Sequence, residues 1–152
     1  MTTLADPSAR QRLRHRIEGL TADAPRQWGS MTAPQMICHL TDSFRLTTGE
    51  KGASAVHNWF MRSVVKFVAL NVPMTWPKGV RTRPEMDQKV GGTPPTQFEE
   101  DKTLLLSYFD RFCCEPRQFP TLAHPLFGKM KDKEWDRWAY LHVDHHLRQF
   151  CK

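Results

Sequence analysis

The spacing of apolar residues is helical along almost the whole chain. Asp6 followed by Pro7 is typical of a helix start, with an aspartate N-cap and proline at the first helical position. Leu13, Ile17 and Leu20 then recur at intervals of three and four. This pattern predicts a first, rather polar helix.

A second helix is predicted from a capping pattern. The Thr32 hydroxyl and the Gln35 amide can satisfy each other's backbone donors, and Met31 and Met36 are placed to pack as a hydrophobic staple. We expect this helix to run from there to about Thr47.

The middle of the chain predicts a buried helix followed by a long loop. Residues 55–71 are rich in large apolar side chains, and a proline at position 73 closes the stretch. We expect this third helix to be mostly buried. Residues 72–95 hold five prolines and show no period, which predicts a long crossover loop. Its bases Lys78, Arg81 and Arg83 are the candidates to contact a ligand, and the alternative is a solvated surface loop.

Two further helices complete the predicted architecture. Residues 96–99 form a second capping pattern ahead of an apolar stripe through Leu105, Phe109 and Phe112. After a punctuated stretch at 116–131, Asp132 can cap a last helix. No alternating strand pattern is present, so the predicted fold is all-α: four or five antiparallel helices with one long crossover loop, in one domain spanning 1–152.

The last helix places two histidines on its inward face. At 100° per residue, Trp138, His142 and His146 all fall within about 60° of Trp135. Charged residues occupy the opposite side: Arg137, Asp144 and Arg148. We therefore expect His142 and His146 to point into the core one turn apart, where their imidazoles can meet one ion.

A third imidazole, His39, falls on or beside the apolar arc of the second helix. Three neutral imidazoles make a metal site with an open position. His145 could replace His146 as a ligand or lie behind the ligands. A metal-free alternative remains, in which each histidine is a core residue hydrogen-bonded to a neighbour. That alternative is weakened because two adjacent buried imidazoles would leave several nitrogens without partners.

Composition and charge narrow the classes of binding partner that we expect. The 152 residues are 39% hydrophobic, enough for one domain, and 22 Lys and Arg against 16 Asp and Glu give a formal charge of +6, which favours anionic partners. No apolar window is long enough to span a membrane and the N-terminus has no apolar signal region, so we expect a cytoplasmic protein without a membrane partner.

Nucleic acid is not the expected partner. The four arginines of the first helix alternate at every second position and so spread around it instead of forming a stripe. They are Arg10, Arg12, Arg14 and Arg16. The four cysteines contain no C-x-x-C pair and are expected to be reduced. Because Cys38 points about 100° away from its neighbour His39, a Cys/His nucleophile pair is a weak hypothesis.

Three runs of the chain carry a resemblance to a known family. Residues 28–42 (WGSMTAPQMICHLTD) and 142–150 (HVDHHLRQF) resemble the DinB-like superfamily of metalloenzymes, and residues 124–128 (HPLFG) look like one of its uncharacterised subfamilies. The most specific element is an early His-Leu followed much later by H-x-x-x-H.

The resemblance implies a four-helix bundle with a three-histidine metal site, onto which His39, His142 and His146 map. Zinc or nickel is the metal it implies. Several relatives transfer or isomerise with a low-molecular-weight thiol such as bacillithiol, mycothiol or glutathione, and family members often form homodimers. The resemblance therefore implies a small-molecule substrate and a metal that activates a thiol or water, while the long loop at 72–95 departs from the thiol-transferase pattern.

Overall fold

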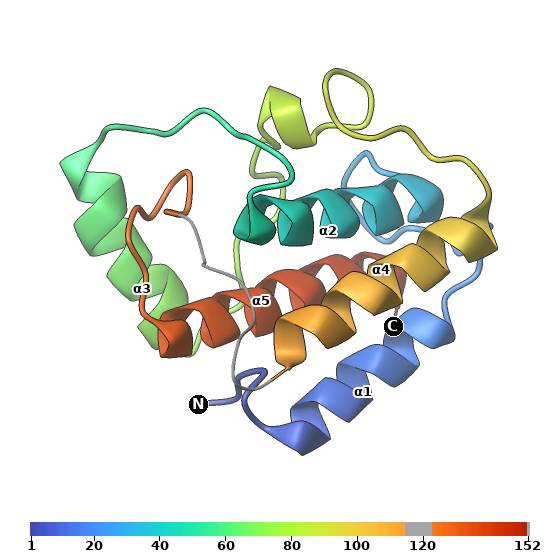
Figure 1. Ribbon diagram of the computed structural model, residues 1–152, viewed down its shortest axis with the longest axis horizontal. Coiled ribbons are helices and arrows are strands. Elements are labelled where there is room, and N and C mark those ends of the chain that lie inside the picture. The colour runs from blue at the N-terminus through green and yellow to red at the C-terminus, as the bar shows by residue number, and fades with distance from the viewer. Residues whose placement is uncertain (115–122, 152) are drawn as a thin grey trace.

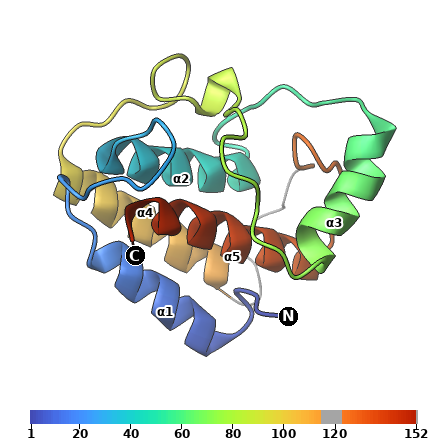
Figure 2. The same ribbon diagram turned by 180° about the vertical axis from the view of Figure 1, so that it is seen from behind.

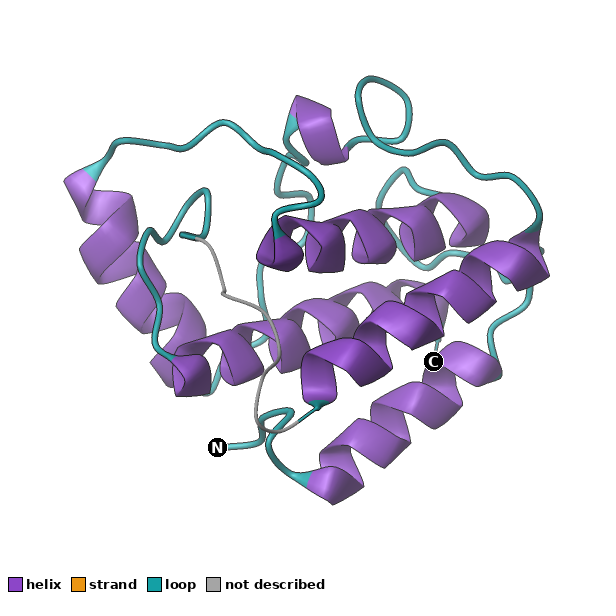
Figure 3. Ribbon diagram, in the orientation of Figure 1, coloured by secondary structure: helices purple, strands orange, loops and turns teal. Residues whose placement is uncertain are grey.

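The described part of the chain, residues 1–114 and 123–151 of a computed structural model, is helical and contains no strand (Figure 3). Its elements are α1 (Pro7–Glu18), α2 (Ala33–Thr48), a π-helical turn η1 (Met61–Val65), α3 (Lys66–Asn71), a 3₁₀ turn η2 (Pro84–Met86), α4 (Phe98–Cys113), α5 (Asp132–Leu147) and a 3₁₀ turn η3 (Arg148–Phe150). The all-helical prediction is confirmed for these residues. Of the expected punctuated stretch at 116–131, residues 116–122 lie outside them.

Side-chain caps set the first two helix starts as predicted. The Asp6 carboxylate accepts the N–H of Ser8 at 2.9 Å. Thr32 and Gln35 form the reciprocal capping box, with the Thr32 N–H donating to Gln35 Oε1 at 2.9 Å. These orphan donors are satisfied within the first turn, which is why the boundaries follow from local sequence.

The first residues of the last two long helices, α4 and α5, differ from the prediction. The hydroxyl and N–H of Thr96 both bond the Asp101 carboxylate, so Thr96 does not pair with Glu99, and α4 begins at Phe98. At α5 the Glu134 carboxylate accepts the N–H of Lys131 at 2.7 Å, which makes residue 131, not 132, the cap.

The four long helices run in two directions (Figure 1). α1 and α4 oppose each other, because Arg10 near the start of α1 donates to the carbonyl of Cys113 at the end of α4, 2.7 Å. At the other end, Lys102 donates to the carbonyl of Leu20, 3.2 Å. α1 and α5 run the same way, as do α2 and α4 (Figure 1). The helices therefore do not simply alternate in direction, and a regular antiparallel arrangement is not confirmed.

α5 lies in the middle of the molecule, with α1, α2 and α4 around it (Figure 2). Its Trp135 side is buried as predicted. The opposite side, expected to face outward, is also covered: Asp144 accepts from Arg16 of α1 at 2.6 Å, and Arg137 donates to the carbonyl of Leu70 at 3.1 Å. Two of the three charged residues that indicated solvent therefore make contacts between helices, whereas Arg148 is exposed as predicted.

The helix at 59–71, which contains η1 and α3, lies at the edge of the molecule (Figure 1). Among its residues only Leu70 is buried. Trp59 is 75% exposed and Phe67 63%, so the prediction of a mostly buried helix is wrong. An apolar pattern indicates a face that excludes water, but it does not supply the partner that would cover it.

The crossover loop that follows α3 is anchored to α2. The buried carboxylate of Asp42 accepts the N–H and the hydroxyl of Thr93 at 2.8 and 2.7 Å, and Gln88 approaches it at 3.4 Å. This anchor holds η2 against α2. Among the described residues, no helix is both long and apolar enough to cross a membrane.

Candidate metal centre

α2 and α5 bring three histidines to one point. His39 comes from the first half of α2, and His142 and His146 lie one turn apart on α5. His39 and His146 are buried and His142 is half-buried. Each offers a ring nitrogen, and these nitrogens all lie within 4.8 Å of one another, so the group could hold a metal ion.

Hydrogen bonds set which nitrogens converge. The Nδ1–H of His39 donates to the carbonyl of Met86 at 3.0 Å, and the Nδ1–H of His146 donates to Oε1 of Gln149 at 3.0 Å. Since a neutral imidazole carries one N–H, the Nε2 atoms of both rings present lone pairs. Both point at His142, whose Nε2 lies 3.2 Å from that of His39 and 3.1 Å from that of His146.

The positions of the three Nε2 atoms fit a shared metal cation better than a shared hydrogen. At most one hydrogen can sit on Nε2 of His142, so at most one of the two close N···N contacts is a hydrogen bond and the other brings two lone pairs together. Two nitrogens bound to zinc at about 2.05 Å with tetrahedral angles are about 3.3 Å apart, close to both separations. The donor set fits zinc and other metals that favour imidazole.

Burial favours the neutral form of all three rings. It lowers the pKa of His39 below its ordinary value, although the hydrogen bond to Met86 acts in the opposite direction. Burial also lowers the pKa of His142 and of His146 well below the usual range, and the neighbouring imidazoles add to this effect. Neutral imidazole is the form that binds metal.

Residues before α2 complete the surroundings of the histidine group. The N–H of Gln27 donates to the carbonyl of Gln149 at 2.6 Å. Gly29 has φ +84°, and a Cβ there would lie 2.9 Å from the Gln149 side chain. Glycine therefore allows the chain to pass close to the residue that orients His146.

Tryptophans line the group. Trp138 stacks on the ring of His142 at 5.0 Å between centroids, and Trp76 of the crossover loop lies 6.2 Å from that ring. His145 is turned aside: its nearest aromatic partner is Trp28, 4.7 Å away, and it does not belong to the converging group. Aromatic walls of this kind restrict water around bound ligands.

The three loop bases have different surroundings. The ammonium of Lys78 lies 5.4 Å above the ring of Trp28, which places it near the histidine group. Arg83 is held by Ser54 and Glu85. Arg81 is exposed. Only Lys78 is linked to the site by described contacts, and a ligand-binding role for all three stays a prediction.

Two other candidate residues have structural surroundings. Burial raises the pKa of Cys38 to about 12, with the nearby Asp101 adding to the effect, so its thiol is not a nucleophile at neutral pH. The buried Nδ1 of His124 accepts the N–H groups of Leu126 and Phe127, both at 3.2 Å. The HPLFG run therefore forms a turn.

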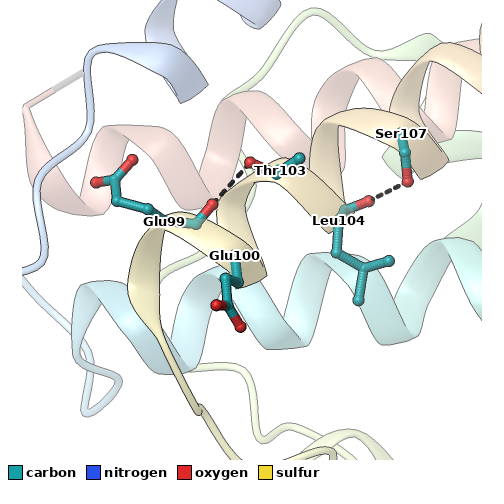
Figure 4. Close-up of a pocket in the computed structure, with 5 residues that line it drawn as sticks. All are labelled: Glu99, Glu100, Thr103, Leu104 and Ser107. Carbon is teal, nitrogen blue, oxygen red and sulfur yellow. Dashed lines mark hydrogen bonds between the residues drawn. The ribbon is translucent and has the colours of Figure 1, made fainter.

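A surface depression lies elsewhere, on α4 (Figure 4). All five residues that line it come from one face of α4: Glu99, Glu100, Thr103, Leu104 and Ser107. The hydroxyls of Thr103 and Ser107 bond carbonyls of their own helix (Figure 4). It contains no group that converges on a ligand, and we assign no function to it.

Some contributors to the site had no sequence signal. The Met86 carbonyl is a backbone group and could be supplied by any residue at that place. Gln149 did carry a signal, because it lies three residues after His146 on the inward face. The positive φ of Gly29 and the approach of Trp76 depend on the path of loops.

The described part of the chain is helical, and two of its helices bring three histidines together, so the protein is of the class of helical proteins with a candidate three-histidine metal centre. The chain belongs to the family DUF1569, described as "Protein of unknown function", whose model matches residues 7–152 and so includes all three histidines. No curated protein and no solved structure matches the chain.

Proposed function

We propose that His39, His142 and His146 bind one divalent ion, zinc or nickel, and that the chain is a DinB-like metalloenzyme. The observation that carries this proposal is the convergence of three Nε2 atoms, two of them with Nδ1–H groups held by fixed oxygens. Three protein ligands leave one position of a tetrahedral ion for a ligand from outside. When bound, such an ion lowers the pKa of a thiol or water at that position and so supplies a nucleophile at neutral pH.

The reaction we propose is an S-transfer from a low-molecular-weight thiol or a hydrolysis, on a small anionic or electrophilic molecule. Trp76 and Trp138 limit water at the histidines. Lys78 and Arg81 are exposed cations able to bind carboxylates of such a thiol, with Lys78 nearer the group. Arg83 would have to exchange Glu85 for the ligand.

The same proposal extends to the fold, the oligomeric state and the compartment. We propose that α1, α2, α4 and α5 form a four-helix bundle of DinB-like type within a single domain, and that the protein works as a homodimer in the cytoplasm. Four free cysteines, one buried, one partly buried and two exposed, are compatible with a reducing compartment. The first-helix arginines do not favour nucleic acid, since Arg14 and Arg16 pair with Asp110 and Asp144.

Metal content tests the site. Protein purified without a nickel column should contain about one divalent ion per chain, measured by mass spectrometry of the metals. His39→Ala and His146→Ala should each lose most of it. His145→Ala is the matched control, because His145 is adjacent in sequence but outside the group, and it should keep the parent's content. Equal occupancy in all four proteins would refute the assignment.

The alternative is an ion that only joins α2 to α5, or a metal-free scaffold. Catalysis predicts turnover against a panel of thiols and electrophiles that depends on metal and is lost in His142→Ala while the fold survives. If fully loaded protein shows no turnover and chelation merely lowers the melting temperature, the ion is structural.

A further inference from the structure

An exposed apolar helix face at the edge of the molecule has no role in the metal centre. We call it the α3 face and define it by Trp59, Phe60, Val64, Phe67 and Val68. These are five of the eleven large hydrophobic residues that are exposed in the described part of the chain. Phe60 is 53% exposed and Trp59 75%, so both rings stand largely in solvent. Exposed apolar residues grouped this way mark an interaction surface.

The chain segment around this face also carries the net charge of the protein. Residues 51–83 contain six bases and no acid, whereas the other residues contain sixteen bases and sixteen acids. The formal charge of +6 therefore equals the charge of this one segment. Its bases are Lys51, Lys66, Lys78, Arg62, Arg81 and Arg83.

Part of this charge is available for a partner. Lys51, Lys66 and Arg83 pair with acids from other segments. Arg62 and Arg81 are exposed, as is Lys78. The loop beside α3 adds the exposed bases Lys129 and Lys131, and the first turn of α5 adds Lys133. The loop adjoins α3 directly because the Lys66 ammonium donates to the carbonyl of residue 129 at 2.9 Å.

We propose that the α3 face docks on an anionic lipid surface, lying in the plane of the membrane interface. A helix with Trp and Phe on its apolar side and bases around it binds such an interface through both buried apolar area and attraction to anionic headgroups. The helix stands at the edge of the molecule, where it can approach a flat surface (Figure 1). The prediction of no membrane partner rested on the lack of a spanning segment, and surface binding needs none.

A second copy of the chain is a poorer match for this face. In a two-fold dimer the same patch meets itself, so the bases of residues 51–83 would oppose the same bases. Anionic headgroups complement this charge.

Vesicle binding tests the proposal on the full chain. Sedimentation with phosphatidylcholine vesicles is compared with sedimentation when phosphatidylglycerol is added. The parent should bind the anionic vesicles, bind neutral ones much more weakly, and be released by salt. The double variant Trp59→Ser/Phe67→Ser should bind roughly tenfold more weakly or worse. Its matched control, Val90→Ser/Leu104→Ser, removes two exposed apolar side chains outside the α3 face and should bind like the parent.

The charge contribution is tested separately. Arg62→Gln/Arg81→Gln should weaken binding to anionic vesicles by roughly fivefold per base and leave binding to neutral vesicles unchanged. Failure of the parent to bind anionic vesicles, or equal binding by the α3 variant, would overturn the proposal. So would a parent dimer in sedimentation velocity that Trp59→Ser/Phe67→Ser converts to monomer without any vesicle binding, since the face would then pair with a second copy.

Discussion

Two hydrogen bonds determine which ring nitrogen of His39 and of His146 carries the hydrogen and which carries the lone pair. Each Nδ1–H is given to an oxygen, the Met86 carbonyl or the Gln149 side chain, and this leaves each Nε2 as an acceptor. Oxygen partners of this kind orient the ring and raise its basicity as a ligand. We therefore expect metal affinity to depend on the Met86 carbonyl and the Gln149 side chain almost as much as on the histidines themselves.

Replacing Gln149 should weaken metal binding without removing a ligand. Gln149→Leu leaves the Nδ1–H of His146 without its acceptor, so we expect zinc affinity to fall roughly 10- to 100-fold, measured by competition with a chelating dye. Gln149→Glu keeps an acceptor and should retain parent affinity or exceed it. Parent affinity in Gln149→Leu would contradict the role given to this residue.

His124 should make the fold sensitive to acid. Burial lowers its pKa to about 3, while the unfolded chain has the ordinary value near 6.5. The unfolded state therefore takes up a proton that the folded state refuses, and stability falls as pH drops below about 6.5. Between pH 7 and 5 this one group should remove about 2 kcal/mol of unfolding free energy, measured by urea denaturation at each pH.

The matched variant is His124→Asn, whose side-chain oxygen can accept the same backbone N–H groups without titrating. Its unfolding free energy should change less between pH 7 and 5 than that of the parent, by about the same 2 kcal/mol. An unchanged slope would show that the acid sensitivity lies in other groups.

At the scale of the helices, boundaries were predictable where a cap is local. Asp6 and Thr32 satisfy donors within one turn, and both starts follow the sequence. The inward direction of His142 and His146 was predictable for a similar reason, since the helical period alone determines which residues share a face. The exposure of Trp59 was not, because burial depends on whether another element covers the face.

The opposite side of α5 shows the same limit for polar residues. Asp144 indicated solvent in the sequence, yet it pairs with Arg16 across α1 and α5. The Met86 carbonyl could not be predicted either, since it reaches His39 only through the path of the crossover loop.

Asp42 should be the residue that keeps this loop in place. Its carboxylate is fully buried and accepts two hydrogen bonds from Thr93, with Lys51 3.4 Å away. Asp42→Asn removes the charge and turns one acceptor into a donor, so we expect a loss of about 3 kcal/mol of unfolding free energy in urea denaturation.

Asp110→Asn is the comparison for this variant. Asp110 pairs with Arg14 at the surface with 55% of its side chain exposed, and such pairs contribute less than about 1 kcal/mol. If both variants lost the same unfolding free energy, the contacts of Asp42 with the loop would contribute no more than a surface ion pair does. Faster amide exchange in residues 84–93 of Asp42→Asn would show that the loop itself is released.

At the scale of the whole molecule, the histidines join α2 to α5, so a bound ion should stabilise the entire fold. An ion that binds only the folded state at a hundred times its dissociation constant adds about 2.7 kcal/mol. For a chain of this size we expect zinc to raise the melting temperature by roughly 5–10 °C in calorimetry. His142→Ala should show no such rise, and a rise of equal size would place the zinc elsewhere.

The separation of the three histidines along the chain has a consequence for biosynthesis. His39 and His142 are 103 positions apart. During translation, the first imidazole leaves the ribosome long before the other two exist, and α2 must wait for α5 before the three can meet. Metal capture would therefore be among the last events of folding, because a chain that stops before α5 has only His39 of the three histidines that form the group.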